Sequence, residues 1–123
     1  MRGERFNFSR PDSILFFVFS QMINFTQEQF QDFVETAFLG VEPWIEKFNV
    51  TPEFVRIIDE EGKKHFISKK DLEVAATKYY NKQNNKRRSK FSEEFVEDLL
   101  CDWDVVDTSN VFQIAMFNEI VYC

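Results

Sequence analysis

One pattern occurs three times in this chain and predicts where three helices begin. In each copy a serine or threonine follows an apolar residue, and a second apolar residue lies five positions after the first. The hydroxyl can accept a hydrogen bond from an amide of the first helical turn, and the two apolar side chains can pack across that turn. The capping residues are Thr26, Ser68 and Ser92. They predict helices that begin at residues 27, 69 and 93.

Apolar residues at helical spacing continue each of these starts. The first stripe ends at Gly40, a natural helix stop, and the second leads into a basic segment at 82–90. A further short helix is expected at 43–48, with Pro43 in its first turn. The stripes comprise Phe30, Phe33, Val34, Ala37 and Phe38, then Leu72, Ala75, Ala76 and Tyr79, and then Phe95, Val96, Leu99, Leu100 and Trp103.

The C-terminal part of the chain predicts one more helix. Thr108 or Ser109 could cap it, because both hydroxyls precede a run of apolar residues at helical spacing. Its apolar side would hold Val111 and Phe112. A strand is the alternative for residues 119–123.

Two structures are compatible with residues 52–67. Pro52 could open a helix that Gly62 ends. However, residues 54–58 are rich in β-branched side chains, and Gly62 lies in a turn-forming sequence that precedes a second short apolar run. The second pattern favours a β-hairpin at about 54–67.

The aromatic content favours helices as the main structure. The chain has 16 phenylalanines but only 3 glycines and 3 prolines. So many large rings with so few turn residues favour helices packed through aromatic contacts over a glycine-rich β-sandwich. A length of 123 residues fits one domain. We therefore predict a small, aromatic-rich α+β domain, mainly α, with four to five helices and one β-hairpin.

The first 21 residues differ from the rest and predict an N-terminal extension to a globular domain at 22–123. Their apolar run at 14–19 is too short to span a membrane and lacks the small-residue cleavage site of a signal peptide. The run could add a strand or short helix to the core. Alternatively, translation could begin at Met22, and burial of Phe16, Phe17 and Phe19 would contradict that alternative. No membrane segment is predicted.

No pattern indicates catalysis or a cofactor. Three glycines disfavour a glycine-rich phosphate loop, and His65, the single histidine, has no nucleophile motif around it. Asp102, Asp104 and Asp107 could reach a divalent cation only if their segment curled, and no glycine there allows such a turn. We therefore predict no catalytic residue, metal site or cofactor, and an enzymatic function is disfavoured.

The two cysteines indicate a reducing compartment. Cys101 and Cys123 are too few to build a disulfide framework. We interpret both as reduced thiols, which is typical of a cytoplasmic protein.

Charge is strongly segregated along the chain. The net charge is −6, yet residues 78–90 contain six basic residues and no acidic one, whereas residues 92–123 contain eight acidic residues and no basic one. Helical spacing places Glu94, Glu97 and Asp98 on a common face, and the apolar side chains Phe95, Leu99 and Trp103 are expected to turn away from it. Like charges this close repel one another, and a basic partner would relieve the repulsion.

This acidic segment carries the leading functional hypothesis. We expect a non-enzymatic protein-interaction module of bacterial or phage type, similar in role to an inhibitor or immunity protein, that binds a partner with a basic surface. No pattern indicates an oligomeric state. The predicted partner-binding residues are Glu94, Glu97, Asp98, Asp102 and Asp104.

The basic segment at 78–91 supports an alternative function, a regulator that binds nucleic acid. Its cations could neutralise phosphates and its tyrosines could stack on bases. A solvated linker between two helices is the other interpretation of the same residues. The predicted nucleic-acid-binding residues are Tyr79, Tyr80, Lys82, Lys86, Arg87, Arg88 and Lys90.

The three predicted caps can be tested by their effect on stability. Replacing Thr26, Ser68 or Ser92 by alanine should each lower the free energy of unfolding by about 1 kcal/mol, because an amide of the first turn loses its acceptor. Urea denaturation of the three variants measures the change. Midpoints that match the wild type in all three would show that the helices begin elsewhere.

Overall fold

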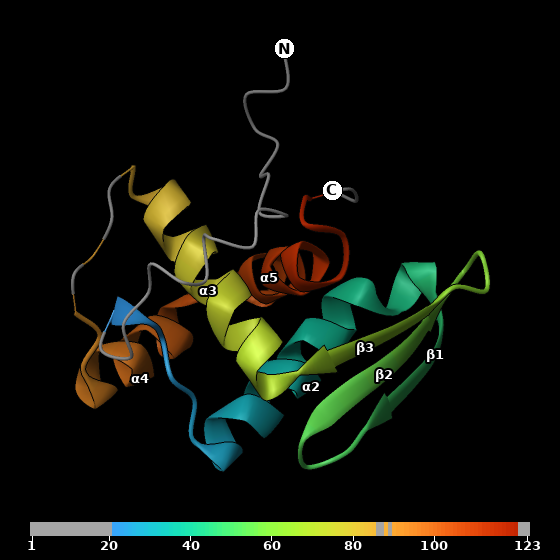
Figure 1. Cartoon of the computed structure of the whole chain (residues 1–123), viewed down its shortest axis with the longest axis horizontal. Helices are drawn as coiled ribbons and strands as arrows, with labels where there is room; N and C mark the ends of the chain where they lie inside the picture. Colours follow the sequence, from blue (N-terminus) through green and yellow to red (C-terminus); the bar gives the residue numbers. More distant parts are fainter. Residues whose placement is uncertain (1–20, 86–87, 89, 121–123) are drawn as a thin grey trace.

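The computed structural model describes residues 21–85, 88 and 90–120. Within these residues it contains four α-helices, one short 3-10 helix and one antiparallel sheet with strand order β1-β2-β3 (Figure 1). The predicted class, α+β and mainly α, is confirmed. The elements are α2 (Gln27–Val41), η2 (Glu42–Trp44), β1 (Ile45–Val50), β2 (Phe54–Asp59), β3 (Lys64–Ser68), α3 (Lys69–Gln83), α4 (Glu93–Asp102) and α5 (Val105–Phe117).

All three predicted helix starts are confirmed by the capping hydrogen bonds. The Thr26 hydroxyl accepts from the amide of Gln29 at 3.0 Å, and the Gln29 side chain in turn accepts from the Thr26 amide. Ser68 forms the same reciprocal box with Asp71. The Ser92 hydroxyl accepts from an amide three residues on at 3.1 Å. Local chemistry therefore determines where α2, α3 and α4 begin.

One further helix prediction is wrong, and the C-terminal helix is confirmed but begins earlier than expected. The expected helix at 43–48 is only a 3-10 turn ending at Trp44, after which the chain becomes strand β1. The strand forms because β2 has a free edge on that side, and β1 pairs with it in antiparallel register. The last helix begins at Val105 and is capped by Asp104, whereas Thr108 and Ser109 are buried inside it.

The predicted hairpin is confirmed at β2 and β3, and the helix alternative for residues 52–67 is wrong. Antiparallel pairing joins Val55 with Ile67 and Ile57 with His65. Gly62 has a φ of +85°, a conformation that suits glycine in the connecting turn. The prediction missed β1, which extends the hairpin to three strands.

Gly40 does not stop helix α2, contrary to expectation. The helix continues through it to Val41. A Cβ atom at position 40 would lie 2.8 Å from both the Ser109 Cβ and a Val105 methyl carbon of α5. Glycine is therefore required because α2 and α5 approach each other closely at this point.

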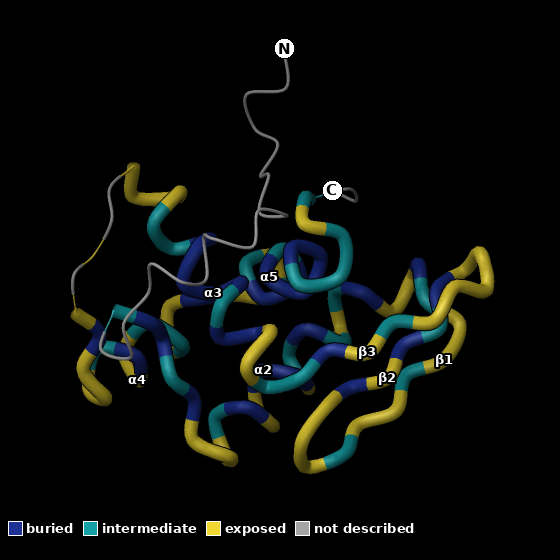
Figure 2. Tube along the Cα trace, in the orientation of Figure 1, coloured by how far each residue is buried: buried dark blue, intermediate teal, exposed yellow. Residues whose placement is uncertain are grey.

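The core is built from buried residues of the helices and of the sheet strands (Figure 2), and aromatic rings form a connected set within it. Phe33 of α2 lies 5.3 Å from the Phe25 ring, 6.4 Å from Trp103 and 6.4 Å from Phe112, measured between centroids. Phe112 of α5 in turn stacks on Phe48 of β1 at 6.1 Å. The aromatic packing that the composition predicted is therefore the contact that joins helices to sheet.

Buried polar side chains of α3 hold the segment that precedes α2. The Ile23 amide donates to the Thr77 hydroxyl at 2.8 Å, and the Phe25 amide donates to a Glu73 carboxylate oxygen at 2.7 Å. Met22, Ile23 and Phe25 are all buried, so this segment belongs to the core. The predicted extension lies outside the described residues except at position 21, and so do Phe16, Phe17 and Phe19.

Glu73 should make folding depend on pH through this contact. Burial raises the pKa of Glu73 above its ordinary value, against the opposing effects of the Phe25 amide and of two nearby lysines. A raised carboxyl pKa means that the native state holds its proton to higher pH than the unfolded chain does. The Glu73 contribution to stability is therefore complete below the unfolded pKa of 4.5 and is lost as pH rises through the folded value.

Two Glu73 variants separate the hydrogen bond from the charge. Glu73→Ala leaves the Phe25 amide without an acceptor and should lower the free energy of unfolding by about 1–3 kcal/mol. Glu73→Gln keeps an acceptor and removes the buried charge. Its free energy of unfolding should therefore equal that of the wild type near pH 4 and exceed it toward pH 7. Denaturant unfolding at both pH values measures this, and equal losses in both variants would contradict the role of the hydrogen bond.

Candidate functional site

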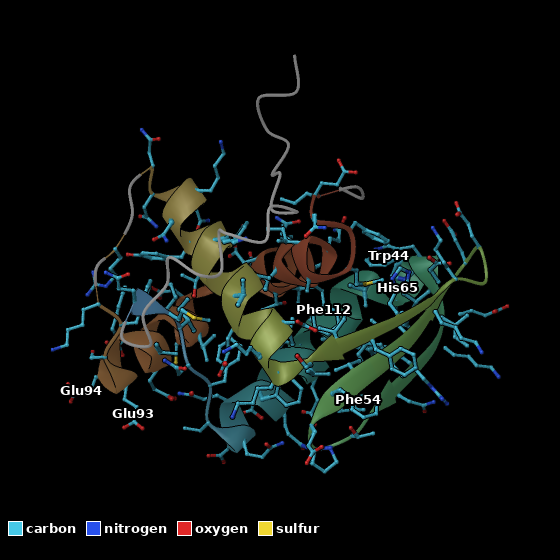
Figure 3. All side chains as sticks on the ribbon, in the orientation of Figure 1. Trp44, Phe54, His65, Glu93, Glu94 and Phe112 are labelled. Carbon is cyan, nitrogen blue, oxygen red and sulfur yellow. The ribbon has the colours of Figure 1, made fainter. Side chains whose placement is uncertain are left out.

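His65, the single histidine, lies near the start of strand β3, beside the turn that joins β2 to β3. Its Nε2 lies 2.9 Å from a carboxylate oxygen of Asp59, and its ring contacts Phe117 edge-on with 5.3 Å between centroids. Asp59 also accepts hydrogen bonds from two amides of the β2–β3 turn. Burial acts to raise the pKa of Asp59, but the bonds from His65 and from the turn prevail and lower it. Figure 3 shows His65 beside Trp44, far from α4 and its Cys101.

Two adjacent residues of the predicted common face of α4, Glu97 and Asp98, contact different neighbours. The Glu97 carboxylate accepts a 2.7 Å hydrogen bond from the Gln29 side chain of α2. Asp98 lines a groove together with the end of α3. Glu94, Asp98 and Asp102 are exposed and follow one another at four-residue spacing, so they form one stripe along the helix.

An open groove of about 620 Å³ lies between the end of α3 and helix α4. This volume is within the range typical of ligand sites. Its wall combines two carboxylates of the stripe, Asp98 and Asp102, with aromatic rings that were expected to turn away from the acidic face. The lining residues are Tyr80, Gln83, Asn84, Phe95, Asp98, Leu99, Asp102, Trp103 and Asp107.

The two carboxylates of α4 that line the groove have no partner in the part of the chain that the structure describes. Neither Asp98 nor Asp102 forms an ion pair or hydrogen bond with another described residue, and both side chains are exposed. They lie one helical turn apart, so both can reach one ligand. The groove therefore presents two available negative charges beside apolar rings.

Asp104 and Asp107, by contrast, are committed to the start of α5. Each carboxylate accepts from the other residue's amide, at 3.0 and 3.2 Å, which completes a capping box. The bond from the Asp107 amide lowers the pKa of Asp104. Asp107 also accepts a 2.7 Å hydrogen bond from the Tyr79 hydroxyl of α3. Asp104 is exposed but does not line the groove, so it is not brought together with Asp98 and Asp102.

A cation of the chain itself already occupies an aromatic ring beside the groove. The guanidinium carbon of Arg88 lies 3.6 Å from the centroid of the Phe95 ring and 5.8 Å from that of Phe91. The Arg88 Nε donates to the Lys90 carbonyl at 2.6 Å, which fixes the orientation of the guanidinium. Phe95 is thus a ring on which an arginine stacks.

The aromatic part of the predicted nucleic-acid site is used inside the fold. Tyr79 is buried, and Tyr80 packs edge-on against Phe91 and Phe95 at 5.5 Å from each. Of the cations, Lys82, Arg88 and Lys90 lie within the described residues, whereas Lys86 and Arg87 lie outside them. Nucleic-acid binding by this segment stays a prediction, without stacking tyrosines to support it.

Two smaller hollows lie between the helices, and the first of them also combines carboxylates with aromatic rings. One, of about 150 Å³ between α2 and α4, is lined by the exposed free thiol of Cys101 and by the already bonded Glu97. The other, of about 210 Å³ between α3 and α5, contains Lys78, and burial lowers the pKa of its amine. Cys123, the other predicted thiol, lies outside the described residues.

Searches for a metal cluster and for a membrane span give no candidate in the described residues. No three histidine, cysteine or carboxylate side chains at 21–85, 88 and 90–120 are grouped so as to hold a metal ion. No helix in the same residues is long and apolar enough to cross a bilayer. Comparison with protein-family models, with curated proteins and with solved structures returned no match. Any functional inference therefore rests on the chemistry of the groove itself.

Sequence patterns identified only part of the groove. Asp98 and Asp102 were expected in the site, but Phe95, Trp103 and Asp107 were not. The available signal was the four-residue spacing of Asp98 and Asp102. The same spacing places Phe95 and Leu99 on the adjoining side of α4. That signal could not reveal Tyr80, because its approach to α4 depends on how α3 and α4 pack.

The Tyr79–Asp107 bond beneath the groove can be tested directly. Burial first, and then the bond to Asp107, raises the pKa of Tyr79 to about 12. Tyr79→Phe should lower the free energy of unfolding by about 1.5–3 kcal/mol, because Asp107 loses a charge-assisted hydrogen bond. Its absorbance titration should also lack the phenol that ionises near pH 12.

Tyr80→Phe is the matched control for that experiment. The Tyr80 hydroxyl has no hydrogen bond to another described residue, so its removal should leave stability nearly unchanged. Equal stability of the two variants would show that the Tyr79 hydroxyl contributes nothing to the α3–α5 contact.

Proposed function

We propose that this protein is a non-enzymatic interaction module that binds a basic segment of a protein partner in the groove between α3 and α4. The single observation that supports this most is that Asp98 and Asp102 meet aromatic rings in one groove. An arginine or lysine side chain satisfies both kinds of group, because its charge pairs with carboxylates and its cation is attracted to ring faces. The proposed role is that of an inhibitor or immunity protein of bacterial or phage type.

The stacking of Arg88 on Phe95 supports the choice of a cationic ligand. The groove wall already accepts a guanidinium on this ring at 3.6 Å from the centroid. Arginine suits such a wall better than lysine, because its planar group can stack and donate two parallel hydrogen bonds to a carboxylate. A partner's arginine would repeat the contact between a guanidinium and a ring that Arg88 and Phe95 already make within the chain.

The charge of α4 supports the same proposal. Glu94, Asp98 and Asp102 are neighbours along one stripe, and no basic residue occurs at 92–123 to offset them. Their mutual repulsion costs folding stability, and a docked cation would relieve it. The same field would steer a basic partner toward the groove and speed its association at low salt.

We propose a cytoplasmic location for this activity. Cys101 is an exposed free thiol, and exposed thiols persist where reducing conditions are maintained. The location is consistent with the interpretation of both cysteines as reduced.

The groove can be tested with a short fluorescent polyarginine peptide and fluorescence anisotropy. The wild-type protein should bind the peptide, and affinity should fall with added salt. Asp98→Asn together with Asp102→Asn should weaken binding roughly 2- to 30-fold, since each lost ion pair at a surface is worth about 0.2–1 kcal/mol. Circular dichroism would verify that the variant is folded.

Glu28→Gln with Glu35→Gln is the matched control, because it removes the same charge from exposed positions of α2 that do not line the groove. Its affinity should stay close to that of the wild type. If both double variants weaken binding equally, net charge and not the groove binds the peptide, and the proposal fails.

A further inference from the structure

The side of the sheet that faces away from the core carries an unusual set of residues. Residues paired directly across antiparallel strands point to the same face. One row across the sheet on this face is Lys47, Ile58 and Lys64, and the next is Asn49, Arg56 and Phe66. A last pair joins Phe54 with Ser68. We call these eight positions the outer sheet face.

Two phenylalanine rings of the outer sheet face are open to solvent. Phe66 is 61% exposed and Phe54 is 36% exposed. The rings lie edge to face with 5.9 Å between centroids, so they form one platform rather than two isolated side chains. Most of the other aromatic rings in the described residues are buried, so two exposed rings side by side indicate a contact surface.

The charge of the outer sheet face is opposite to that of the whole protein. Lys47, Arg56 and Lys64 are exposed there, and none of the eight positions is acidic, although the chain carries a net charge of −6. Arg56 is paired with Phe66, so a cation lies directly beside the more exposed ring. Figure 3 shows Phe54 on the sheet, well away from Glu93 and Glu94 of α4, which lie at the left end of the molecule. The acidic helix of the same molecule therefore does not cover this face.

We propose that the outer sheet face binds single-stranded nucleic acid. Bases would stack on Phe66 and Phe54, and Lys47, Arg56 and Lys64 would contact phosphates, while Asn49 can reach a base edge. Aromatic rings interspersed with cations on an open sheet suit unpaired bases, whose faces are available for stacking. A duplex offers phosphates but hides its base faces, so it would use the cations and leave the rings unused.

This site is distinct from the groove between α3 and α4 and from the basic segment at 78–91. It does not depend on the proposed binding of a basic partner. Stacking platforms of this kind tolerate different bases, so weak dependence on base sequence is expected.

Fluorescence anisotropy with labelled oligothymidine, a matching RNA and a duplex of equal length tests the proposal. The single strands should bind better than the duplex. The logarithm of affinity should fall with the logarithm of salt concentration with a slope of about 2, since three cations release about 0.7 counterion each. Phe66→Ala should weaken binding roughly 5- to 150-fold, the effect of one lost base stack. Phe66→Tyr should restore it, because it keeps the ring.

Matched controls use equally exposed residues elsewhere. Leu39→Ala of α2, where the side chain is 63% exposed, and Lys70→Ala of α3 should leave affinity unchanged. Arg56→Ala should weaken binding and lower the salt slope. Circular dichroism of each variant would verify the fold.

Four results would overturn the proposal. They are no binding at low salt, equal binding of the duplex, equal affinity of Phe66→Ala and wild type, or a loss of binding only when Lys86, Arg87 and Arg88 are replaced. The last result would assign binding to the basic segment. Sedimentation that shows Phe66-dependent self-association without oligonucleotide binding would assign the face to a second copy of the chain instead.

Discussion

The packing of Phe33 against three other rings is the contact on which the fold depends. It joins the segment before α2 through Phe25, the link between α4 and α5 through Trp103, and α5 through Phe112. Phe112 carries the connection to the sheet through Phe48. These rings pack among the aliphatic residues of the core, to which the helices and the sheet both contribute. Rigid rings with few rotamers also fix the distances between elements, which positions the groove and the sheet face.

The same packing separates the charges of the chain. It places α4 at one end of the molecule and the sheet toward the other (Figure 1). Asp98 and Asp102 therefore stay unneutralised within the described residues, and so do the cations of the sheet. The two proposed sites follow from this separation, since each presents one sign of charge beside aromatic rings. A net charge of −6 alone would have suggested only the acidic one.

Much of the architecture could be predicted because it depends on short-range chemistry. The caps at Thr26, Ser68 and Ser92 act within one helical turn, and the β2–β3 turn is set by Gly62 and its neighbours. The candidate site was harder to predict from the sequence. Asp98 and Asp102 could be selected from charge, and helical spacing placed Tyr79 in an apolar stripe, but neither pattern indicated that the Tyr79 hydroxyl is buried against Asp107. A periodic pattern does not say which neighbour a helix face meets.

The sequence by itself determined the starts of α2, α3 and α4, the helical majority and the uneven charge, because each depends on residues close together along the chain. Only the tertiary structure decided the rest. β1 replaced a locally plausible helix because β2 needed a partner along its edge, and Gly40 became a crossing point because α5 lies against α2. The groove and the outer sheet face arise from residues that are far apart in the sequence or on different strands. Both surfaces form because burial of the aromatic core brings these residues together, and that burial requires the assembled chain.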